Sequence, residues 1–340
     1  MAGDGSKTIL LTGATGFVGH ALEPRLVAAG WKVRCLTRDG AAARAARPDL
    51  DWVEGNLERT EDCARVLRGS AAAVYLVHGM GDSPDYLRRE SEVAHIFARS
   101  AAAAGLERIV YLGGIDPSGE PSLHLRSRLA VGEALRAGAV SCIELRASMI
   151  IGDGSLSWLI VRDLAARLPV MVLPSWMRSR TEPVAIDDVL VALVAATRVE
   201  VDGVGGVGAS PHHASFDLPG PDRLSCRQIL EQTARLMGLR PPRTIELPFL
   251  SPRLSSHWVR FVTRARWAVA REVVLGLEHD MLARDGAFWS RIGHPSLLSF
   301  SEAARRALEA ESAHGPVPGQ WGRIERARKR RAFSDDVVVR

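Results

Sequence analysis

Short apolar runs alternate with stretches of helical spacing through the first half of the chain. The runs that read as strands lie at residues 8–11, 32–37, 51–54, 72–77, 108–112 and 141–145. Helical patterns separate several of them, at residues 17–27, 41–47 and about 84–104. Strands that alternate with helices predict right-handed crossovers and a parallel sheet with helices on both faces. The expected fold class is therefore α/β, with a doubly wound sheet.

Prolines interrupt this pattern beyond residue 150, and the predicted elements become shorter. Helices are predicted at residues 187–198, after the capping box Ser225 to Gln228, after a second capping box Ser299 to Glu302, and at 257–283. These features favour a smaller α-rich annex on the substrate side, interleaved with the sheet domain. We expect a core domain at 1–155, the annex at 156–311 and a basic, poorly ordered tail at 312–340.

A glycine-rich turn joins the first predicted strand to the first predicted helix. Its glycines are Gly13, Gly16 and Gly19. The first permits a tight turn, the second lets a dinucleotide pyrophosphate approach the backbone, and the third lets the helix lie close to the strand. The N-terminus of the helix then offers N–H groups to the phosphates. We predict a Rossmann-type dinucleotide site, which also includes Thr15, Phe17 and Val18.

The residues after the second strand bear on the choice between NAD and NADP. An NAD site usually carries an acidic side chain there, which binds the ribose hydroxyls. Here Thr37 is followed by Arg38, whose guanidinium suits a 2'-phosphate. Asp39 is near enough to keep NAD as an alternative. We predict NADP as the cofactor; the non-functional explanation for Arg38 is a solvated surface side chain.

The third and fourth strands end in residues that suit the rest of the cofactor. Asn56 can hydrogen-bond the adenine edge, and Leu57 can pack against its ring. After the fourth strand, Val77, His78 and Gly79 form a loop where the backbone has to pass the cofactor. His78 could also contact a substrate or serve as a structural histidine.

Composition and charge narrow the class of protein. With 340 residues, of which 46% are hydrophobic, the chain can bury a sizeable core. The net charge of +5 comes partly from basic residues beyond 320, and a terminal charge cluster is usually a solvated chain end, so we do not expect nucleic-acid binding. The four cysteines form no C-x-x-C pair, which argues against zinc or disulfides. No apolar run is long enough to span a bilayer, and we expect a cytoplasmic protein. The oligomeric state stays open.

The motifs together resemble the extended and atypical branches of the short-chain dehydrogenase/reductase superfamily, above all its NmrA-like NAD(P)-binding members. The glycine turn carries the resemblance, as do Leu145-Arg-Ala-Ser-Met-Ile-Ile-Gly-Asp-Gly154 and Pro183-Val-Ala-Ile-Asp-Asp-Val189. A bacterial subgroup shares the further segments found here at 76–81, 124–128 and 178–183. The resemblance covers residues 7 to about 310. It implies the Rossmann fold and NAD(P) binding.

The chain departs from catalytic members of this superfamily at the reacting end of the cofactor. Those members carry a serine after strand five and a Tyr-x-x-x-Lys pair on the next helix, whose tyrosine transfers a proton. This chain has Gly113 and Gly114, then His124 and Arg128 at i, i+4 spacing on one helical face. With an ordinary pKa of about 6.5, His124 could donate a proton, and Arg128 could orient the ribose. Alternatively, both only hold the dinucleotide in a non-catalytic redox sensor or assembly protein.

Three further residues are candidates for contact with the substrate. Arg146 and Ser155 flank the loop after strand six, and Arg180 belongs to a polar group in the annex. Arginines there would suit an anionic or carbonyl substrate, although solvated arginines are common in this chain. The sequence thus predicts an NADP-dependent oxidoreductase acting on an unidentified carbonyl or enone, with the non-catalytic protein as the alternative.

Overall fold

A computed structural model describes most of the chain. The described residues are 7–78, 85–167, 170–174, 178–200, 213–241, 243–247 and 279–313. Gly79, nearly all of the predicted helix at 257–283 and the basic tail beyond residue 313 lie outside these ranges. Within them, no helix has the length and apolar character needed to cross a membrane.

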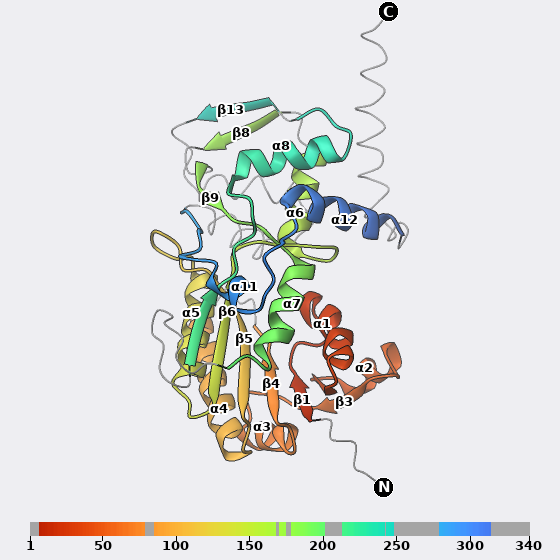
Figure 1. Ribbon diagram of the computed structural model, residues 1–340, viewed down its shortest axis with the longest axis vertical. Coiled ribbons are helices and arrows are strands. Elements are labelled where there is room, and N and C mark those ends of the chain that lie inside the picture. The colour runs from red at the N-terminus through yellow and green to blue at the C-terminus, as the bar shows by residue number, and fades with distance from the viewer. Residues whose placement is uncertain are drawn as a thin grey trace, which may run out of the picture.

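A parallel sheet of seven strands forms the centre of the molecule (Figure 1). Its order is β11-β6-β5-β4-β1-β2-β3. The strands are β1 (Thr8–Leu11), β2 (Lys32–Thr37), β3 (Asp51–Glu54), β4 (Ala72–Tyr75), β5 (Arg108–Gly114), β6 (Ser141–Ala147) and β11 (His213–Asp217). The register places Leu11 opposite both Cys35 and Val74, so the strands around β1 end level with one another. This confirms the predicted α/β doubly wound fold.

The seventh strand comes from the second half of the chain, where the predicted annex is interleaved with the sheet domain. The pattern there favours an annex over more sheet, yet β11 pairs in parallel with β6 along its whole length, from His213 to Asp217. The segment has only two apolar residues, Ala214 and Phe216, between polar ones. Because such a segment is too short and too polar to stand out by periodicity, its place in the sheet is set by tertiary packing.

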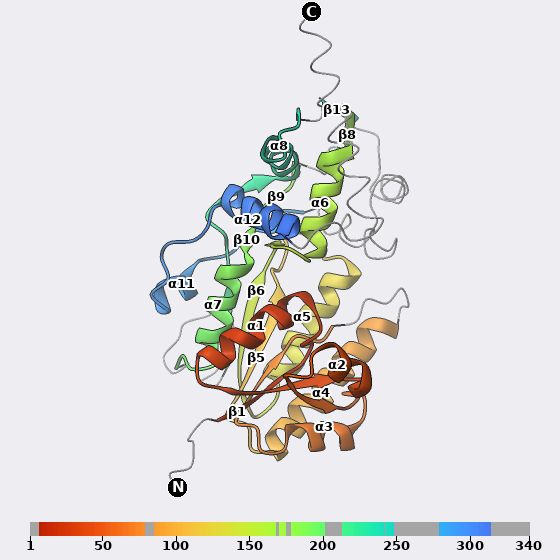
Figure 2. The ribbon, with the colours of Figure 1, turned by 90° about the vertical axis from the view of Figure 1, so that its right-hand side faces the viewer.

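Helices cover both faces of the sheet, as Figures 1 and 2 show. They are α1 (Phe17–Ala28), α2 (Gly40–Ala46), α3 (Thr60–Leu67), α4 (Asp85–Ala103), α5 (Leu123–Arg136), α7 (Ile186–Ala196) and the short α11 (Ala287–Arg291). Alternate residues of β1 point to opposite faces. Ile9 and Leu11 join one buried cluster with residues of α1 and α7, whereas Leu10 joins another with residues of α3, α4 and α5.

The annex lies beyond the carboxyl ends of the strands and has its own core. It contains α6 (Leu156–Arg167), α8 (Cys226–Leu236), α12 (Phe300–Ala313) and three two-stranded pairs, β7 (Ile150–Ile151) with β10 (Val184–Ala185), β9 (Arg180–Thr181) with β12 (Leu224–Ser225), and β8 (Val170–Pro174) with β13 (Arg243–Leu247). The predicted capping box at Ser225 and Gln228 opens α8. The fully buried Trp158 donates a hydrogen bond to Glu311 Oε1 at 2.9 Å, which ties α6 to α12. The boundary predicted at residue 155 remains a prediction.

Candidate functional site

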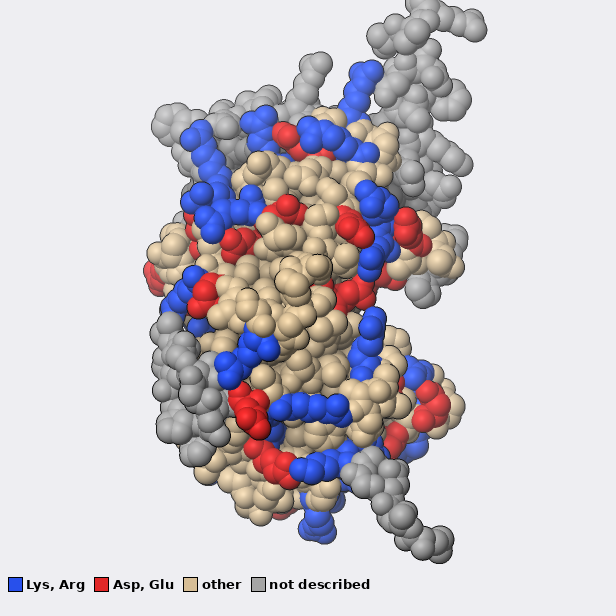
Figure 3. Space-filling model, in the orientation of Figure 1, with Lys and Arg blue, Asp and Glu red and all other residues tan. Residues whose placement is uncertain are grey.

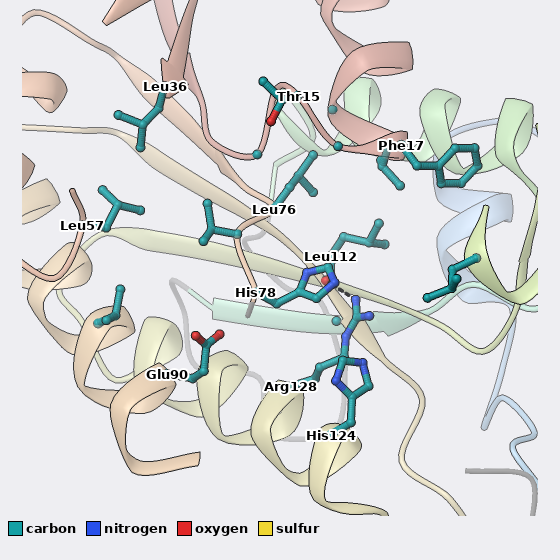
Figure 4. A pocket seen from close by; sticks show the side chains of 18 of the residues that line it. Thr15, Phe17, Leu36, Leu57, Leu76, His78, Glu90, Leu112, His124 and Arg128 are labelled. Atoms are coloured by element: carbon teal, nitrogen blue, oxygen red, sulfur yellow. Dashed lines mark hydrogen bonds between the residues drawn. The ribbon is translucent and has the colours of Figure 1, made fainter. Parts of the chain in front are cut away.

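A cavity of about 780 Å³ opens where the parallel strands end. Residues that follow β1 to β6 line it, together with parts of α4, α5 and the start of α6. The lining includes most of the predicted site residues: Gly13, Thr15, Gly16, Phe17, Val18, Gly19, Arg38, Asn56, Leu57, Val77, His78, His124, Arg128 and Ser155. Side chains from segments far apart in the sequence therefore meet at one place (Figure 4).

The glycine turn has the close contacts that its sequence predicts. Gly13 has φ of +67°, a value that residues with side chains rarely adopt. A Cβ atom at Gly19 would lie 2.2 Å from the carbonyl oxygen of Gly13. Gly16 is the N-cap of α1 and provides no capping side chain, so the first turn of the helix keeps N–H groups available for an anion.

Thr12 joins the end of β1 to the end of β4. Its hydroxyl donates to the carbonyl oxygen of Val74 at 3.2 Å and accepts from the backbone N–H of Leu76 at 2.9 Å. The two bonds fix the chain that leads to His78 against the glycine turn. The chain after β4 is thus tied to the chain after β1 at the edge of the cavity.

Arg38 lies at the end of the cavity formed after β2. Its neighbour Asp39 is the N-cap of α2 and accepts a hydrogen bond from the backbone N–H of Ala42 at 2.9 Å. The only carboxylate on this turn is therefore engaged in capping a helix. Arg38 itself is exposed and makes no ion pair with any described residue. This arrangement leaves a guanidinium open to an anionic ligand.

Asn56 and Leu57 line the cavity after β3. The side-chain amide oxygen of Asn56 accepts from the backbone N–H of Glu58 at 3.1 Å, as in an ordinary turn. The backbone N–H of Asn56 donates to the carboxylate of Asp62. Leu57 is buried. The adenine contacts predicted for both residues remain predictions.

His78, His124 and Arg128 converge at the other end of the cavity (Figure 4). The imidazole rings of the two histidines lie with centroids 5.9 Å apart, edge to face. Arg128 donates from Nη2 to the carbonyl oxygen of Leu112 at 2.8 Å, and its own carbonyl accepts from the hydroxyl of Tyr111 at 2.9 Å. Both His124 and Arg128 line the cavity from α5, and the catalytic roles predicted for them remain predictions.

Burial and a neighbouring positive charge lower the pKa of both imidazoles. Burial, together with the positive charge of Arg128, lowers the pKa of His124 to about 4. Burial, Arg128 and His124 lower the pKa of His78 to about 3. Burial disfavours the charged form of a base, and a neighbouring cation does the same. The pKa of each imidazole thus lies below the ordinary histidine value of about 6.5, which favours the uncharged form at neutral pH without a ligand.

Close packing fills the place where family members carry their serine. A Cβ atom at Gly113 would lie 2.8 Å from Oε1 of Glu144, and one at Gly114 would lie 2.6 Å from Cδ1 of Leu125. Contacts this short require neighbouring atoms to move. Both atoms are the ends of flexible side chains, so a serine at either position would require Glu144 or Leu125 to shift.

Two of the predicted substrate residues do not line the cavity. Arg146 is buried and pairs with Glu144, with Nη2 3.1 Å from Oε2. Arg180 pairs with Asp280 at 2.9 Å. Ser155 does line the cavity, but its hydroxyl donates to the carbonyl oxygen of Ile150 at 2.7 Å. A role of these residues in substrate binding remains a prediction.

The sequence did not identify several residues of α4 that line the cavity. Tyr86, Glu90 and Val93 all face it, and their spacing places them on one side of the helix. Periodicity can reveal such a face, but it cannot tell whether the face meets a cavity or the core. Ser148 and Ser157 were also missed; they belong to the loop after β6 and to the first turn of α6.

Comparisons with known proteins identify relatives of this chain. A family model described as NAD(P)H-binding matches residues 13–165. Ceramide reductase of Caulobacter vibrioides is 29% identical over 73% of this chain and 76% of its own length. The 3-diazoavenalumate denitrifying reductase of a Streptomyces species is 30% identical, over 72% of this chain and 86% of its own.

A solved structure shows the same fold with a bound cofactor. Triphenylmethane reductase of a Citrobacter species, complexed with NADP(H), superposes with a TM-score of 0.67 at 15% identity, over 88% of this chain and 99% of the other. This likeness concerns the fold. The NAD(P)H-binding family model and the two curated reductases confirm the predicted family and NAD(P) as its cofactor class. The chain belongs to the NAD(P)H-binding reductases of the atypical short-chain dehydrogenase/reductase superfamily.

Proposed function

We propose that this protein is an NADPH-dependent reductase of a carbonyl or enone compound. One observation carries the proposal: a single cavity joins a glycine turn and an open guanidinium, Arg38, to a group of polar side chains at its far end. The first end suits the phosphates of a dinucleotide. The second suits a polar reacting group of a substrate. Two reductases among the relatives support the reaction class.

In this proposal, the cofactor and the side chains at the far end of the cavity have separate roles. NADPH, when bound, supplies the hydride. Arg128, held by the carbonyl of Leu112, orients polar groups at the far end of the cavity but does not exchange protons near neutrality. His124 can donate a hydrogen bond as a neutral imidazole, or a proton once it is charged. Leu112 and Gly113 form part of the cavity wall.

The alternative is a non-catalytic protein that senses the redox state of the cofactor. The absence of the serine and of the tyrosine and lysine favours it, as does the uncharged state of His124 in the ligand-free protein. Both hypotheses require the same NAD(P)H site. They differ in whether bound NADPH is consumed.

The test is to follow NADPH oxidation with a panel of aldehydes, ketones, enones and quinones. A reductase oxidises NADPH with at least one member of the panel, and His124→Gln lowers the rate while NADPH affinity is kept. Because deleting one general acid typically costs about 10²–10⁴ in rate, the loss should be easily measured. His95→Gln on the exposed side of α4 is the matched control and should keep full activity. A protein that binds NADPH but oxidises it with no member of the panel contradicts the reductase proposal.

For the cofactor, we propose that Arg38 selects NADPH by contact with the 2'-phosphate. The engagement of Asp39 in helix capping supports this, because that carboxylate is then occupied by the N–H of Ala42. A preference for NADH in the wild-type protein would contradict the assignment.

A further inference from the structure

Arg128 carries a positive charge that forms no ion pair with an acidic side chain among the described residues. Its printed hydrogen bond goes to an uncharged group, the backbone carbonyl of Leu112 at 2.8 Å. It forms no ion pair with any residue that the structure describes, and its Nε atom is buried without an acceptor. A charge removed from water is costly unless it is paired. The guanidinium therefore has unused capacity for an anion at the wall of the cavity.

Two imidazoles flank this guanidinium. His78 comes from the loop after β4 and His124 from the turn of α5 before Arg128, and their ring centroids are 5.9 Å apart. Figure 4 shows the three side chains gathered on one wall. Among the described residues, Glu90 of α4 and Tyr111 of β5 are the other titratable groups here. Glu90 lines the same cavity, and the hydroxyl of Tyr111 donates to the backbone carbonyl of Arg128.

We propose that His78, His124 and Arg128 form a subsite for an oxyanion of the substrate, a carboxylate or a phosphate, and that its binding protonates one of the two imidazoles. This inference rests on the proposed reductase function, because it names the substrate class of the same cavity. A neutral ketone or enone would then be a poorer substrate than one that carries an acidic group.

The proton uptake follows from the charges in the subsite. Without a ligand, Arg128 and burial keep both imidazoles neutral. An anion within about 4–6 Å favours the charged form and raises the pKa of an imidazole by about 1–3 units. One proton then moves from solvent to a ring nitrogen. The imidazolium formed in this way can donate a proton, which a neutral ring does far less readily. Binding of an anionic substrate therefore produces the proton donor for its own reduction.

The experiment measures proton uptake in the protein saturated with NADP⁺, so that no turnover occurs. Benzoate and inorganic phosphate are the anionic probes, and benzamide is the neutral counterpart of benzoate. Calorimetry in buffers of different ionisation enthalpy, at a pH of about 5, counts the protons bound, because a shift of about two to three units moves His124 from mostly neutral to mostly charged there. Histidine titrations followed by NMR then show which of the ten histidines of the chain bind these protons.

We expect at least one of the two anions to bind with uptake of nearly one proton and to raise the titration midpoint of His78 or His124. Benzamide should cause neither effect. Arg128→Gln should weaken anion binding about tenfold or more, since a charge-assisted bond is lost. Arg126→Gln on the exposed side of α5 is the matched control and should leave both readouts unchanged; the side chain is half exposed and lies 4.0 Å from Glu120.

The outcomes separate this inference from the proposed function. If NADP⁺ binds but neither anion changes the histidine titrations, the oxyanion subsite is refuted and the reductase proposal stands. Uptake that persists in Arg128→Gln refutes the subsite as well. Failure of the wild-type protein to bind NADP⁺ at all refutes the proposed function instead. Arg128→Lys keeps the charge, so a folded Lys variant should retain part of the uptake even if the Gln variant is unstable.

Discussion

Gly19 provides a sharp test of how the glycine turn works. It lies in the first turn of α1, where alanine would normally improve helix stability by about 1 kcal/mol. In this structure an added Cβ would lie 2.2 Å from the carbonyl oxygen of Gly13 and 2.8 Å from its carbonyl carbon. These are backbone atoms, so the contact cannot be relieved by rotating a side chain. We predict that Gly19→Ala destabilises the protein.

The expected size follows from these contacts. Forcing a methyl group into a packed site costs about 1–3 kcal/mol. Because the added methyl would meet backbone atoms, the cost should lie at the upper end of this range, and after the gain in helix propensity a net loss of about 2 kcal/mol remains. For a chain of this length, this should lower Tm by about 3 °C even without a cofactor. Because the turn itself must move, NADPH affinity should also fall about tenfold or more, which corresponds to 1.4 kcal/mol or more.

Gly16→Ala is the informative comparison. Its Cβ would meet only the carbonyl oxygen of Gly13, at 3.2 Å, and Gly16 has an extended backbone that alanine can adopt. We expect Gly16→Ala to keep nearly the wild-type Tm but to lose NADPH affinity, because its methyl group enters the cavity. Thermal unfolding and NADPH titration of both variants separate packing from cofactor approach. A Gly19→Ala protein with wild-type Tm and affinity would refute the reasoning.

Other predictions concern single side chains. Arg38→Ala should weaken NADPH binding by about tenfold or more while NADH binding changes little; equal losses for both cofactors would argue against the 2'-phosphate contact. Because the pKa values of His78 and His124 lie below the ordinary 6.5, the ligand-free protein should lose stability as pH falls from about 6.5 towards 4, and unfolding at several pH values should show a smaller loss for His124→Gln. Asp188 is buried and accepts from His294 Nε2 at 2.8 Å and from a backbone N–H, so Asp188→Ala should lower the free energy of unfolding by about 2–4 kcal/mol. NADPH titration of the same variant should give the wild-type affinity.

The first half of the fold could be predicted because its signals are local. The strands 32–37 and 51–54 were predicted with the bounds that the structure shows, since short apolar runs between turns are enough to define them. The glycine turn was equally predictable, because a positive φ at Gly13 and the contact at Gly19 leave room for no other residue type. Residues that follow parallel strands then meet at one edge whatever their distance in sequence.

The rest depends on contacts between distant segments. Nothing near Arg146 in the sequence shows that its guanidinium is buried against Glu144 instead of facing the cavity. The low pKa of His124 likewise arises from burial, which a motif does not record. The cavity-facing side of α4, with Glu90, and the place of β11 in the sheet are set by packing in the same way.

Hydrogen exchange with and without NADPH tests the central claim most directly, because it asks whether one dinucleotide spans the whole cavity. The account predicts that NADPH protects the backbone amides of three separate segments: 13–19 at the glycine turn, 37–39 around Arg38, and 123–128 at the start of α5. The exposed surface of α8 should serve as an unaffected reference. Protection confined to other segments, or no protection at saturating NADPH, would contradict the account.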